Sequence, residues 1–125
     1  MKILSVDDSK MVHMVVAKSL KNYDVEHIMA MNGEEGIAKA TAEKPDVILM
    51  DITMPVMTGL EALAKLKADP ATAGIPVVML TAESATDIQT FAFENGVEKY
   101  LTKPFTEDIL VTCLAGIVPL APKAA

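Results

Sequence analysis

The chain has 125 residues, of which 51% are apolar and 22% are charged, and its formal net charge is −6. This length and composition favour one compact domain with a sizeable core and leave no room for a second domain. The acidic balance argues against nucleic acid or an anionic membrane as a direct partner, because both attract clustered Lys and Arg side chains.

Cysteine content and hydropathy indicate the compartment. Cys113 is the single cysteine, which excludes an intramolecular disulfide and a zinc site built from cysteines. The apolar stretch at the N-terminus is too short for a signal peptide. The longest apolar run, residues 109–121, is shorter than the roughly 20 residues that span a bilayer. We therefore expect a soluble, cytoplasmic protein.

Short β-branched runs alternate with longer segments of helical periodicity. Strands are predicted at residues 3–6, 25–30, 47–50, 77–80 and 100–102, and helices at 10–21, 34–43, 60–68, 84–94 and from the cap Thr106 to about 117. The third and fourth strands are continuously apolar, as is typical of strands buried on both faces. This order predicts an α/β fold, in which a parallel sheet is covered on both faces by right-handed crossovers.

The first predicted helix has an apolar face and a face that carries lysines. Met11, Val15 and Leu20 lie near one face and are expected to contact the core, with lysines on the solvent side. His13 is a lone histidine between apolar residues. We interpret it as a surface or packing residue rather than as a phosphohistidine.

Polar side chains stand where the predicted strands end: Asp7 and Asp8, Asp51, Thr81, and Lys103. Each has an ordinary structural explanation as a helix cap, turn residue or loop charge. However, the carboxyl ends of parallel strands lie at one edge of a sheet, and ligands bind in the crevice outside that edge. The coincidence of all these groups at one edge favours a functional site.

The residue types indicate the chemistry of this site. Three clustered carboxylates repel one another, and a divalent cation removes that cost. Oxygen ligands without nearby His or Cys suit Mg²⁺. A carboxylate beside Mg²⁺ can attack a phosphoryl group to form an acyl phosphate. Lys103 and the hydroxyl of Thr81 are suited to neutralise and orient the phosphoryl oxygens.

Four motifs carry a family likeness: Val6-Asp7-Asp8-Ser9, Met50-Asp51-Ile52-Thr53-Met54-Pro55 with Gly59, Thr81-Ala82, and Lys103-Pro104-Phe105. Together they resemble the receiver domain of response regulators, in particular the stand-alone CheY-like receivers. The resemblance covers residues 1–118 and leaves an Ala/Pro-rich tail at 119–125. It implies a flavodoxin-like, doubly wound, five-stranded parallel sheet in the order 2-1-3-4-5, with five helices.

The resemblance also implies roles for individual residues. Asp51 would accept a phosphoryl group from a sensor histidine kinase. Asp8 directly, Asp7 largely through water, Asp51 and the carbonyl of Thr53 would hold Mg²⁺. Lys103 would pair with the phosphoryl oxygens, and the Lys103–Pro104 peptide bond would be cis.

Further implied roles concern the signal. Thr81 and Tyr100 would form the two halves of a conformational switch, while Thr53 and Glu83 would tune the lifetime of the phosphoryl group. The expected function is a two-component signalling switch with a chemotaxis-type output, which catalyses only its own phosphotransfer and dephosphorylation. The alternative is a phosphorelay intermediate that passes the group to a histidine phosphotransfer protein.

The last predicted helix departs from the usual charged pattern of the family. No charged residue occurs between Asp108 and Lys123. With Leu110, Leu114 and Ile117 facing the core, Ile109, Val111 and Ala115 are expected to point outward. With the preceding helix and the last strand, this face is predicted to bind a protein target or to form a weak homodimer. The alternative is a monomer in which the tail folds back and covers the face.

Three other functions fit the residues less well. A phosphatase with an aspartate nucleophile needs a second aspartate two residues later, where this chain has Thr53. A flavin-binding module needs a Ser/Thr/Gly-rich phosphate loop after the first strand, whereas Asp7 and Asp8 repel phosphate. An inert receiver is not favoured, because every key group of the motif is present.

Overall fold

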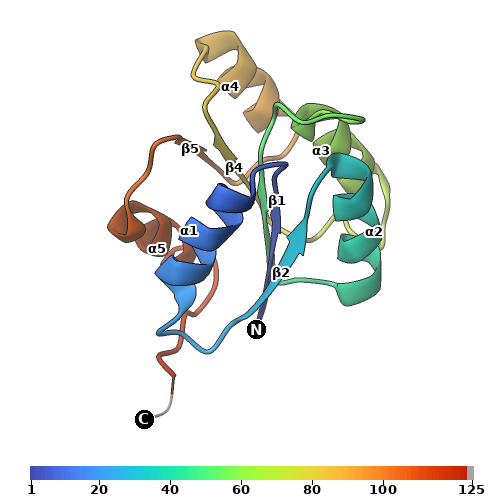
Figure 1. Ribbon diagram of the computed structural model, residues 1–125. Helices are drawn as coiled ribbons and strands as arrows, with labels where there is room; N and C mark the ends of the chain where they lie inside the picture. The colour runs from blue at the N-terminus through green and yellow to red at the C-terminus, as the bar shows by residue number, and fades with distance from the viewer. Residues whose placement is uncertain (124–125) are drawn as a thin grey trace.

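The computed structural model describes residues 1–123, in which strands and helices alternate (Figure 1). The elements are β1 (Lys2–Val6), α1 (Lys10–Leu20), β2 (Glu26–Ala30), α2 (Gly33–Glu43), β3 (Val47–Met50), α3 (Gly59–Ala68), β4 (Val77–Thr81), α4 (Thr86–Glu94), β5 (Lys99–Thr102) and α5 (Glu107–Ala115). All the predicted elements are present, and their ends differ from the prediction by no more than two residues.

The strands form one parallel sheet in the order β2-β1-β3-β4-β5, which confirms the fold class and the strand order. β1 pairs with β2 on one side and with β3 on the other. The direction of winding therefore reverses between β1 and β3, and in open parallel sheets ligands bind outside the carboxyl ends of the strands at such a reversal. Figure 1 shows these ends beside the loops that lead into α1 and α3.

Helices cover both faces of the sheet (Figure 1). On one face, α1 and α5 pack through Val16 and Leu110 against Ile3 and Leu49. On the other face, α2, α3 and α4 contribute buried residues to a second cluster that contains Leu4 and Met50. β3 and β4 are buried along their whole length, as their continuous apolar runs predict.

The prediction for the inner face of α1 is wrong. Met11 is 73% exposed and Val15 is 40% exposed, whereas His13, Val16 and Ser19 are buried with Leu20. The inner face contains two polar residues whose hydrogen bonds are made inside the protein, so hydrophobicity alone indicated the wrong side.

Side-chain caps hold the starts of three helices. Asn32 caps α2, and Thr106 caps α5 as predicted. Thr58 and Glu61 form a reciprocal capping box at α3. In contrast, Ser9 precedes α1 without a side-chain capping bond, so the turn that enters α1 depends on other contacts.

The C-terminal segment pairs with the turn between α1 and β2. Pro122 forms an antiparallel bridge with Tyr23, and the N–H of Asp24 donates to the carbonyl of Ala121 at 2.7 Å. Ile109 on α5 remains 49% exposed. Through Lys123, the tail therefore does not cover the outer face of α5. Among the described residues, none of the helices has both the length and the apolar character needed to cross a membrane.

Candidate functional site

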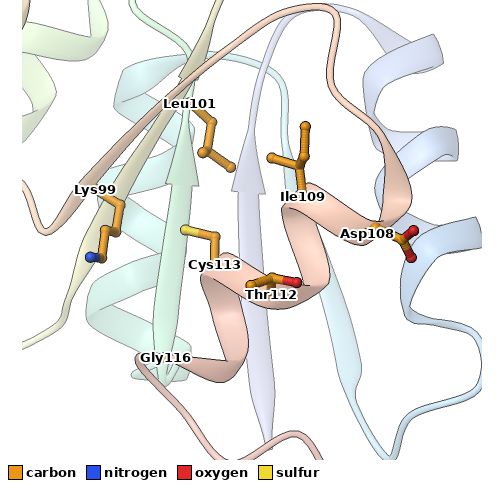
Figure 2. A pocket seen from close by; sticks show the side chains of 7 residues that line it. All are labelled: Lys99, Leu101, Asp108, Ile109, Thr112, Cys113 and Gly116. Carbon is orange, nitrogen blue, oxygen red and sulfur yellow. The ribbon is translucent and has the colours of Figure 1, made fainter.

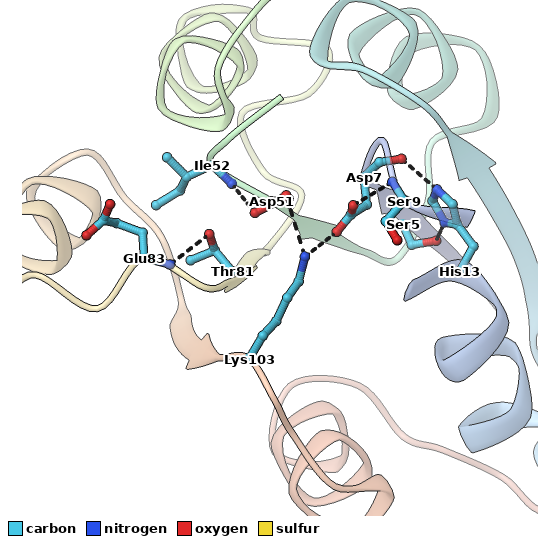
Figure 3. A network of polar contacts seen from close by, with 9 residues as sticks. All are labelled: Ser5, Asp7, Ser9, His13, Asp51, Ile52, Thr81, Glu83 and Lys103. Carbon is cyan, nitrogen blue, oxygen red and sulfur yellow. Dashed lines mark hydrogen bonds and ion pairs between the residues drawn. The ribbon is translucent and has the colours of Figure 1, made fainter. Parts of the chain in front are cut away.

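The predicted polar residues meet at the carboxyl edge of the sheet (Figure 3). Asp7 directly follows β1, Asp51 directly follows β3, and Thr81 is the last residue of β4. Lys103 directly follows β5, and its side chain extends toward the two aspartates. Parallel strands with matched ends therefore bring together residues that are far apart in the sequence.

Three carboxylates form a compact cluster at this edge. One oxygen each from Asp7, Asp8 and Asp51 lies within 4.8 Å of the others. Asp7 and Asp51 are buried, whereas Asp8 is exposed. Because all these donors are hard carboxylate oxygens and one side is open to solvent, the cluster fits Mg²⁺, which retains several waters when it binds protein carboxylates.

Hydrogen bonds orient the two buried carboxylates. Asp51 Oδ1 accepts from the N–H of Ile52 at 2.8 Å, and Asp7 Oδ1 accepts from the N–H of Ser9 at 2.9 Å. The second oxygen of each carboxylate faces Lys103. The Asp51 carboxylate is thus fixed at one oxygen and keeps the other toward the centre of the site.

Lys103 joins the two aspartates. Its Nζ lies 2.7 Å from Asp7 Oδ2 and 3.5 Å from Asp51 Oδ2. Its own backbone N–H donates to the carbonyl of Thr81, and the peptide bond between Lys103 and Pro104 is cis. The buried negative charges are therefore partly compensated by one ammonium group, which leaves the cluster net negative.

Thr81, Glu83 and Tyr100 form a second group beside the carboxylates. Thr81 is buried, and its Oγ1 accepts from the N–H of Glu83 at 3.3 Å. The hydroxyl of Tyr100 donates to the carbonyl of Glu83 at 2.6 Å. Burial raises the pKa of this hydroxyl, and the nearby charges of Glu83 and Asp51 raise it further. Thr81 and Tyr100 thus hold the same segment between β4 and α4.

The remaining site residues lie in the loops around the cluster. The side chain of Thr53 is exposed in the loop after β3, and Glu83 is partly exposed in the loop after β4. The sequence reasoning did not assign a physical role to Gly59. A Cβ at this position would collide with the carbonyl of Asp51, so only glycine allows α3 to begin this close to the end of β3.

Sequence reasoning also missed a polar chain under α1. Ser5 lies between the rings of His13 and His27, and His13 in turn contacts the carbonyl of Asp7. The available signal was Ser5 itself. A hydroxyl inside a strand that is otherwise apolar and buried requires a hydrogen-bond partner.

This fold and this site define a class, the α/β modules with an acidic cluster at the carboxyl edge of a parallel sheet, and comparison with known proteins identifies the family. The family model of the response regulator receiver domain matches residues 3–115. The chain therefore belongs to the response regulator receiver domain family. Members of this family act in two-component signalling, bind Mg²⁺ at an acidic pocket, accept phosphoryl groups from histidine kinases and act on protein targets.

Individual relatives support this assignment. Protein PilH of Pseudomonas aeruginosa is 35% identical over 94% of this chain and 97% of its own length. Chemotaxis protein CheY of Listeria monocytogenes is 35% identical over 91% of this chain and 95% of its own length. The crystal structure of CheY4 of Vibrio cholerae superimposes with a TM-score of 0.87 at 32% identity, covering 94% of this chain and 98% of that one.

Other relatives are longer. The chain spans 51% of one transcriptional regulatory protein and 43% of another, at 35% and 34% identity. The same module therefore occurs both nearly alone and as part of larger regulators.

Proposed function

We propose that the chain is a cytoplasmic signalling switch that accepts a phosphoryl group on Asp51 from a sensor histidine kinase. The observation that carries this proposal is the position of Lys103 Nζ between Asp7 and Asp51, inside the cluster of three carboxylates. This arrangement leaves one oxygen of Asp51 beside the ammonium group of Lys103 and beside the carboxylates of Asp7 and Asp8, as phosphoryl transfer to a carboxylate requires.

In the proposed reaction, Asp51 Oδ2 attacks the phosphorus of a phosphohistidine. An O–P bond forms, the P–N bond breaks, and its electron pair remains on the imidazole nitrogen, which then takes a proton. Lys103 neutralises charge on the transferred oxygens, and the N–H of Ile52 holds the other oxygen of Asp51 in place. Hydrolysis of the acyl phosphate by water returns the carboxylate and releases inorganic phosphate.

We assign the cation site to Asp7, Asp8, Asp51 and the carbonyl of Thr53. When bound there, Mg²⁺ would neutralise the carboxylates and the transferred phosphoryl group. Asp8 is the exposed carboxylate of the cluster and is therefore the one that solvent and a hydrated ion reach first. Thr53 and Glu83 lie in the loops that border this opening, and we assign them the control of water access and hence of phosphoryl lifetime.

The signal is proposed to leave the site through Thr81 and Tyr100. In the structure, the hydroxyl oxygen of Thr81 accepts the N–H of Glu83. A phosphoryl group on Asp51 would offer new acceptors to the proton of that hydroxyl. Movement of Thr81 would release the segment whose carbonyl Tyr100 binds, and Tyr100 would then turn inward. Because β5 carries Tyr100, this movement reaches the outer face formed by α4, β5 and α5.

We propose that the target protein binds to this α4-β5-α5 face. Figure 2 shows a groove between β5 and α5, in which Leu101, Ile109 and Cys113 supply the apolar surface. Ile109 is half exposed, Val111 is partly exposed and Ala115 is exposed. Lys99 and Asp108 border the groove and offer both signs of charge to a partner. A second copy of the chain is the competing occupant.

The first experiment incubates the protein with Mg²⁺ and acetyl phosphate and follows the intact mass, beside Asp51→Asn and the matched control Asp24→Asn. Asp24 is an exposed aspartate just before β2, at the end of the parallel strands opposite the site. A Mg²⁺-dependent phosphoryl adduct on the wild type and on Asp24→Asn, absent from Asp51→Asn, supports the proposal. Equal modification of Asp51→Asn, or no modification of any variant, contradicts it.

A second experiment addresses the output. Light scattering over a concentration series, with and without Mg²⁺ and beryllofluoride, compares the wild type with Ile109→Asp. A dimer that forms only with beryllofluoride and is lost in Ile109→Asp identifies a second copy as the occupant. Strict monomers leave a different protein as the target. Transfer of the phosphoryl group to a histidine phosphotransfer protein faster than its hydrolysis would instead identify a phosphorelay intermediate.

A further inference from the structure

Three polar side chains form a chain between α1 and the sheet. Ser5 on β1 and His13 on α1 are almost fully buried, at 2% and 3% exposure, and His27 on β2 is partly buried. Ser5 Oγ lies 2.7 Å from His13 Nδ1 and 2.6 Å from His27 Nε2. His13 Nε2 lies 2.8 Å from the carbonyl oxygen of Asp7, so the chain ends at the acidic cluster.

The direction of these hydrogen bonds follows from the carbonyl. A carbonyl oxygen only accepts, so Nε2 of His13 carries the proton that it donates to Asp7. In the uncharged ring, Nδ1 of His13 then accepts, and the hydroxyl of Ser5 is its donor. Ser5 has only one proton to donate, so its oxygen accepts from Nε2–H of His27. Three donors thus point in sequence from the edge strand β2 toward Asp7.

The charge state of His27 is consistent with this direction. Burial lowers the pKa of the His27 ring, and the neighbouring ring of His13 lowers it further. His27 is therefore neutral at pH 7 and has one protonated nitrogen available for Ser5.

The carbonyl that His13 binds belongs to the peptide plane between Asp7 and Asp8. A peptide unit is planar, so fixing its oxygen also fixes the amide nitrogen that leads to the Cα of Asp8. The side chain of Asp7 is held independently by Ser9 and Lys103. The backbone N–H of Asp7 donates to the carbonyl of Ala30. Asp8 is exposed, and no hydrogen bond from its own side chain is observed in the described structure. The constraints on Asp8 are thus this peptide plane and the turn closed by the bond from the N–H of Ser9 to Asp7 Oδ1.

The start of α1 makes this constraint more important. Ser9 makes no side-chain capping bond, unlike the caps of α2, α3 and α5. The turn that carries Asp7 and Asp8 is therefore held by Asp7 Oδ1, which accepts the N–H of Ser9, and from inside by the bond from His13, one turn into α1.

We propose that His13, held in orientation by Ser5 and His27, is a positioning residue that sets the Asp7–Asp8 peptide and thereby the geometry in which Asp8 meets a divalent cation. This inference rests on the proposed function of the acidic cluster as a Mg²⁺ site. His13 acts on the cation only through the backbone, in the way that groups behind metal ligands commonly control metal affinity.

The test measures Mg²⁺ affinity by NMR, from the amide signals of Asp8 and Asp51, in the wild type, His13→Leu and His13→Gln. Gln supplies an N–H donor near the position of Nε2, whereas Leu removes the donor and keeps much of the volume. We expect His13→Leu to raise the Kd about tenfold relative to both the wild type and His13→Gln. Met14→Leu, on the exposed side of the same helix, is the control and should retain the wild-type Kd.

Ser5→Ala provides a second variant that leaves His13 in place. It removes the donor to Nδ1 and should raise the Kd, by less than His13→Leu does. If His13→Leu does not fold, this variant decides the question. Unchanged affinity in the folded His13→Leu protein, or in Ser5→Ala when His13→Leu is unfolded, overturns the proposal. Thermal melts alone do not separate packing from positioning, whereas the Mg²⁺ affinity does.

The wild type separates failure of this inference from failure of the proposed function. Ring ¹⁵N signals should show His13 protonated at Nε2 and not at Nδ1, and the reverse tautomer overturns the positioning network. The proposed metal site, and with it this inference, is overturned if the wild type binds no Mg²⁺. It is also overturned if the wild type binds Mg²⁺ no more tightly than Asp8→Asn and Asp51→Asn do. Normal binding that is insensitive to His13 overturns only the inference.

Discussion

At the scale of single residues, Lys103 decides the electrostatic balance of the site. Its Nζ contacts Asp7 Oδ2 at 2.7 Å and lies 3.5 Å from Asp51 Oδ2, and its side chain is only 20% exposed. In the proposed function, the same ammonium group would compete with a metal ion for the carboxylates and would also attract phosphoryl oxygens. Its removal should affect these two functions in opposite directions.

We expect Lys103→Ala to strengthen Mg²⁺ binding about tenfold, because a positive charge in contact with the ligands is removed. The same variant should slow phosphorylation by acetyl phosphate about a hundredfold, because the transferred oxygens lose their protein cation. Isothermal titration and mass spectrometry measure the two effects, with the exposed Lys65→Ala as the control. Loss of both functions together would show that Lys103 mainly maintains the fold.

His27 predicts a pH dependence of stability. Its pKa in the folded protein lies below the ordinary 6.5, chiefly because of burial. The folded state thus binds this proton less readily than the unfolded state, and stability falls as the pH drops below about 6.5. The stability that the neutral His27 ring contributes is fully present above that pH, and it is lost as the pH falls through the pKa of His27 in the folded protein.

This contribution should shrink in His27→Gln, which cannot be protonated. Urea unfolding at pH 7.5 and pH 5.5 should therefore show a larger loss of free energy of unfolding for the wild type than for the variant. Because the two proteins differ only at position 27, the difference between their losses reports His27. Parallel losses in the two proteins would contradict the assignment.

At the scale of elements, the connection from β3 to α3 places Asp51, the proposed phosphoacceptor. Gly59 begins α3 directly behind Asp51, and its N–H donates to the carbonyl of Ile52 at 2.8 Å. Thr58 and Glu61 cap the helix. Within the loop, Val56 has a positive φ of 71°, which is unfavourable for a β-branched residue. The strand, the tight loop and the helix start thus form one rigid support for Asp51.

Gly59→Ala should destabilise the protein by about 3 kcal/mol, because the added methyl group overlaps the backbone of Asp51 rather than a movable side chain. Gly74 provides the matched control, since a Cβ there meets open space. Gly74→Ala should change stability by less than about 1 kcal/mol. Urea unfolding tests both variants, and equal effects would show that α3 moves freely relative to β3.

The elements also show where sequence reasoning succeeded and where it failed. The continuous apolar runs of β3 and β4 identified buried strands because every side chain on both faces contacts the core. The pattern of α1 failed because His13 and Ser19 are buried with satisfied hydrogen bonds, while Met11 is exposed. Polar residues whose hydrogen bonds are satisfied inside the protein are invisible to hydrophobic periodicity.

At the scale of the whole molecule, the C-terminal tail joins the end of the domain opposite the site. The backbone bond from Asp24 to Ala121 and the bond from Lys123 to Asn22, at 2.9 Å, link it to the turn before β2. Leu120 packs against the core cluster of α1 and α5. The boundary at residue 118 is therefore a prediction about which part of the chain is needed for function.

Truncation after Val118 tests that boundary. The shortened chain should keep its fold and its Mg²⁺-dependent phosphorylation, because the acidic cluster lies at the other end of the sheet. Loss of two backbone hydrogen bonds should lower stability by about 2 kcal/mol. Circular dichroism melts and the acetyl phosphate assay provide the measurements. A truncated chain that folds but is not phosphorylated would mean that the tail influences the site.

The sequence by itself determined the alternation of strands and helices, the parallel sheet, and the edge at which Asp7, Asp8, Asp51, Thr81 and Lys103 gather. These conclusions depend on local patterns and on a general rule for parallel sheets. Periodicity did not determine the strand order, which only the family resemblance implied and the structure confirmed.

Only the tertiary structure decided which contacts connect these residues. The bridge from Lys103 to two aspartates and the contact from His13 to Asp7 depend on side-chain positions. So do the support of Asp51 by Gly59 and the position of the tail. Lys103 and the tail join segments that are distant in the sequence, whereas His13 and Gly59 contact residues nearby in the chain. In both cases the distances are set by how helices and loops pack on the sheet, which no local pattern of residues records.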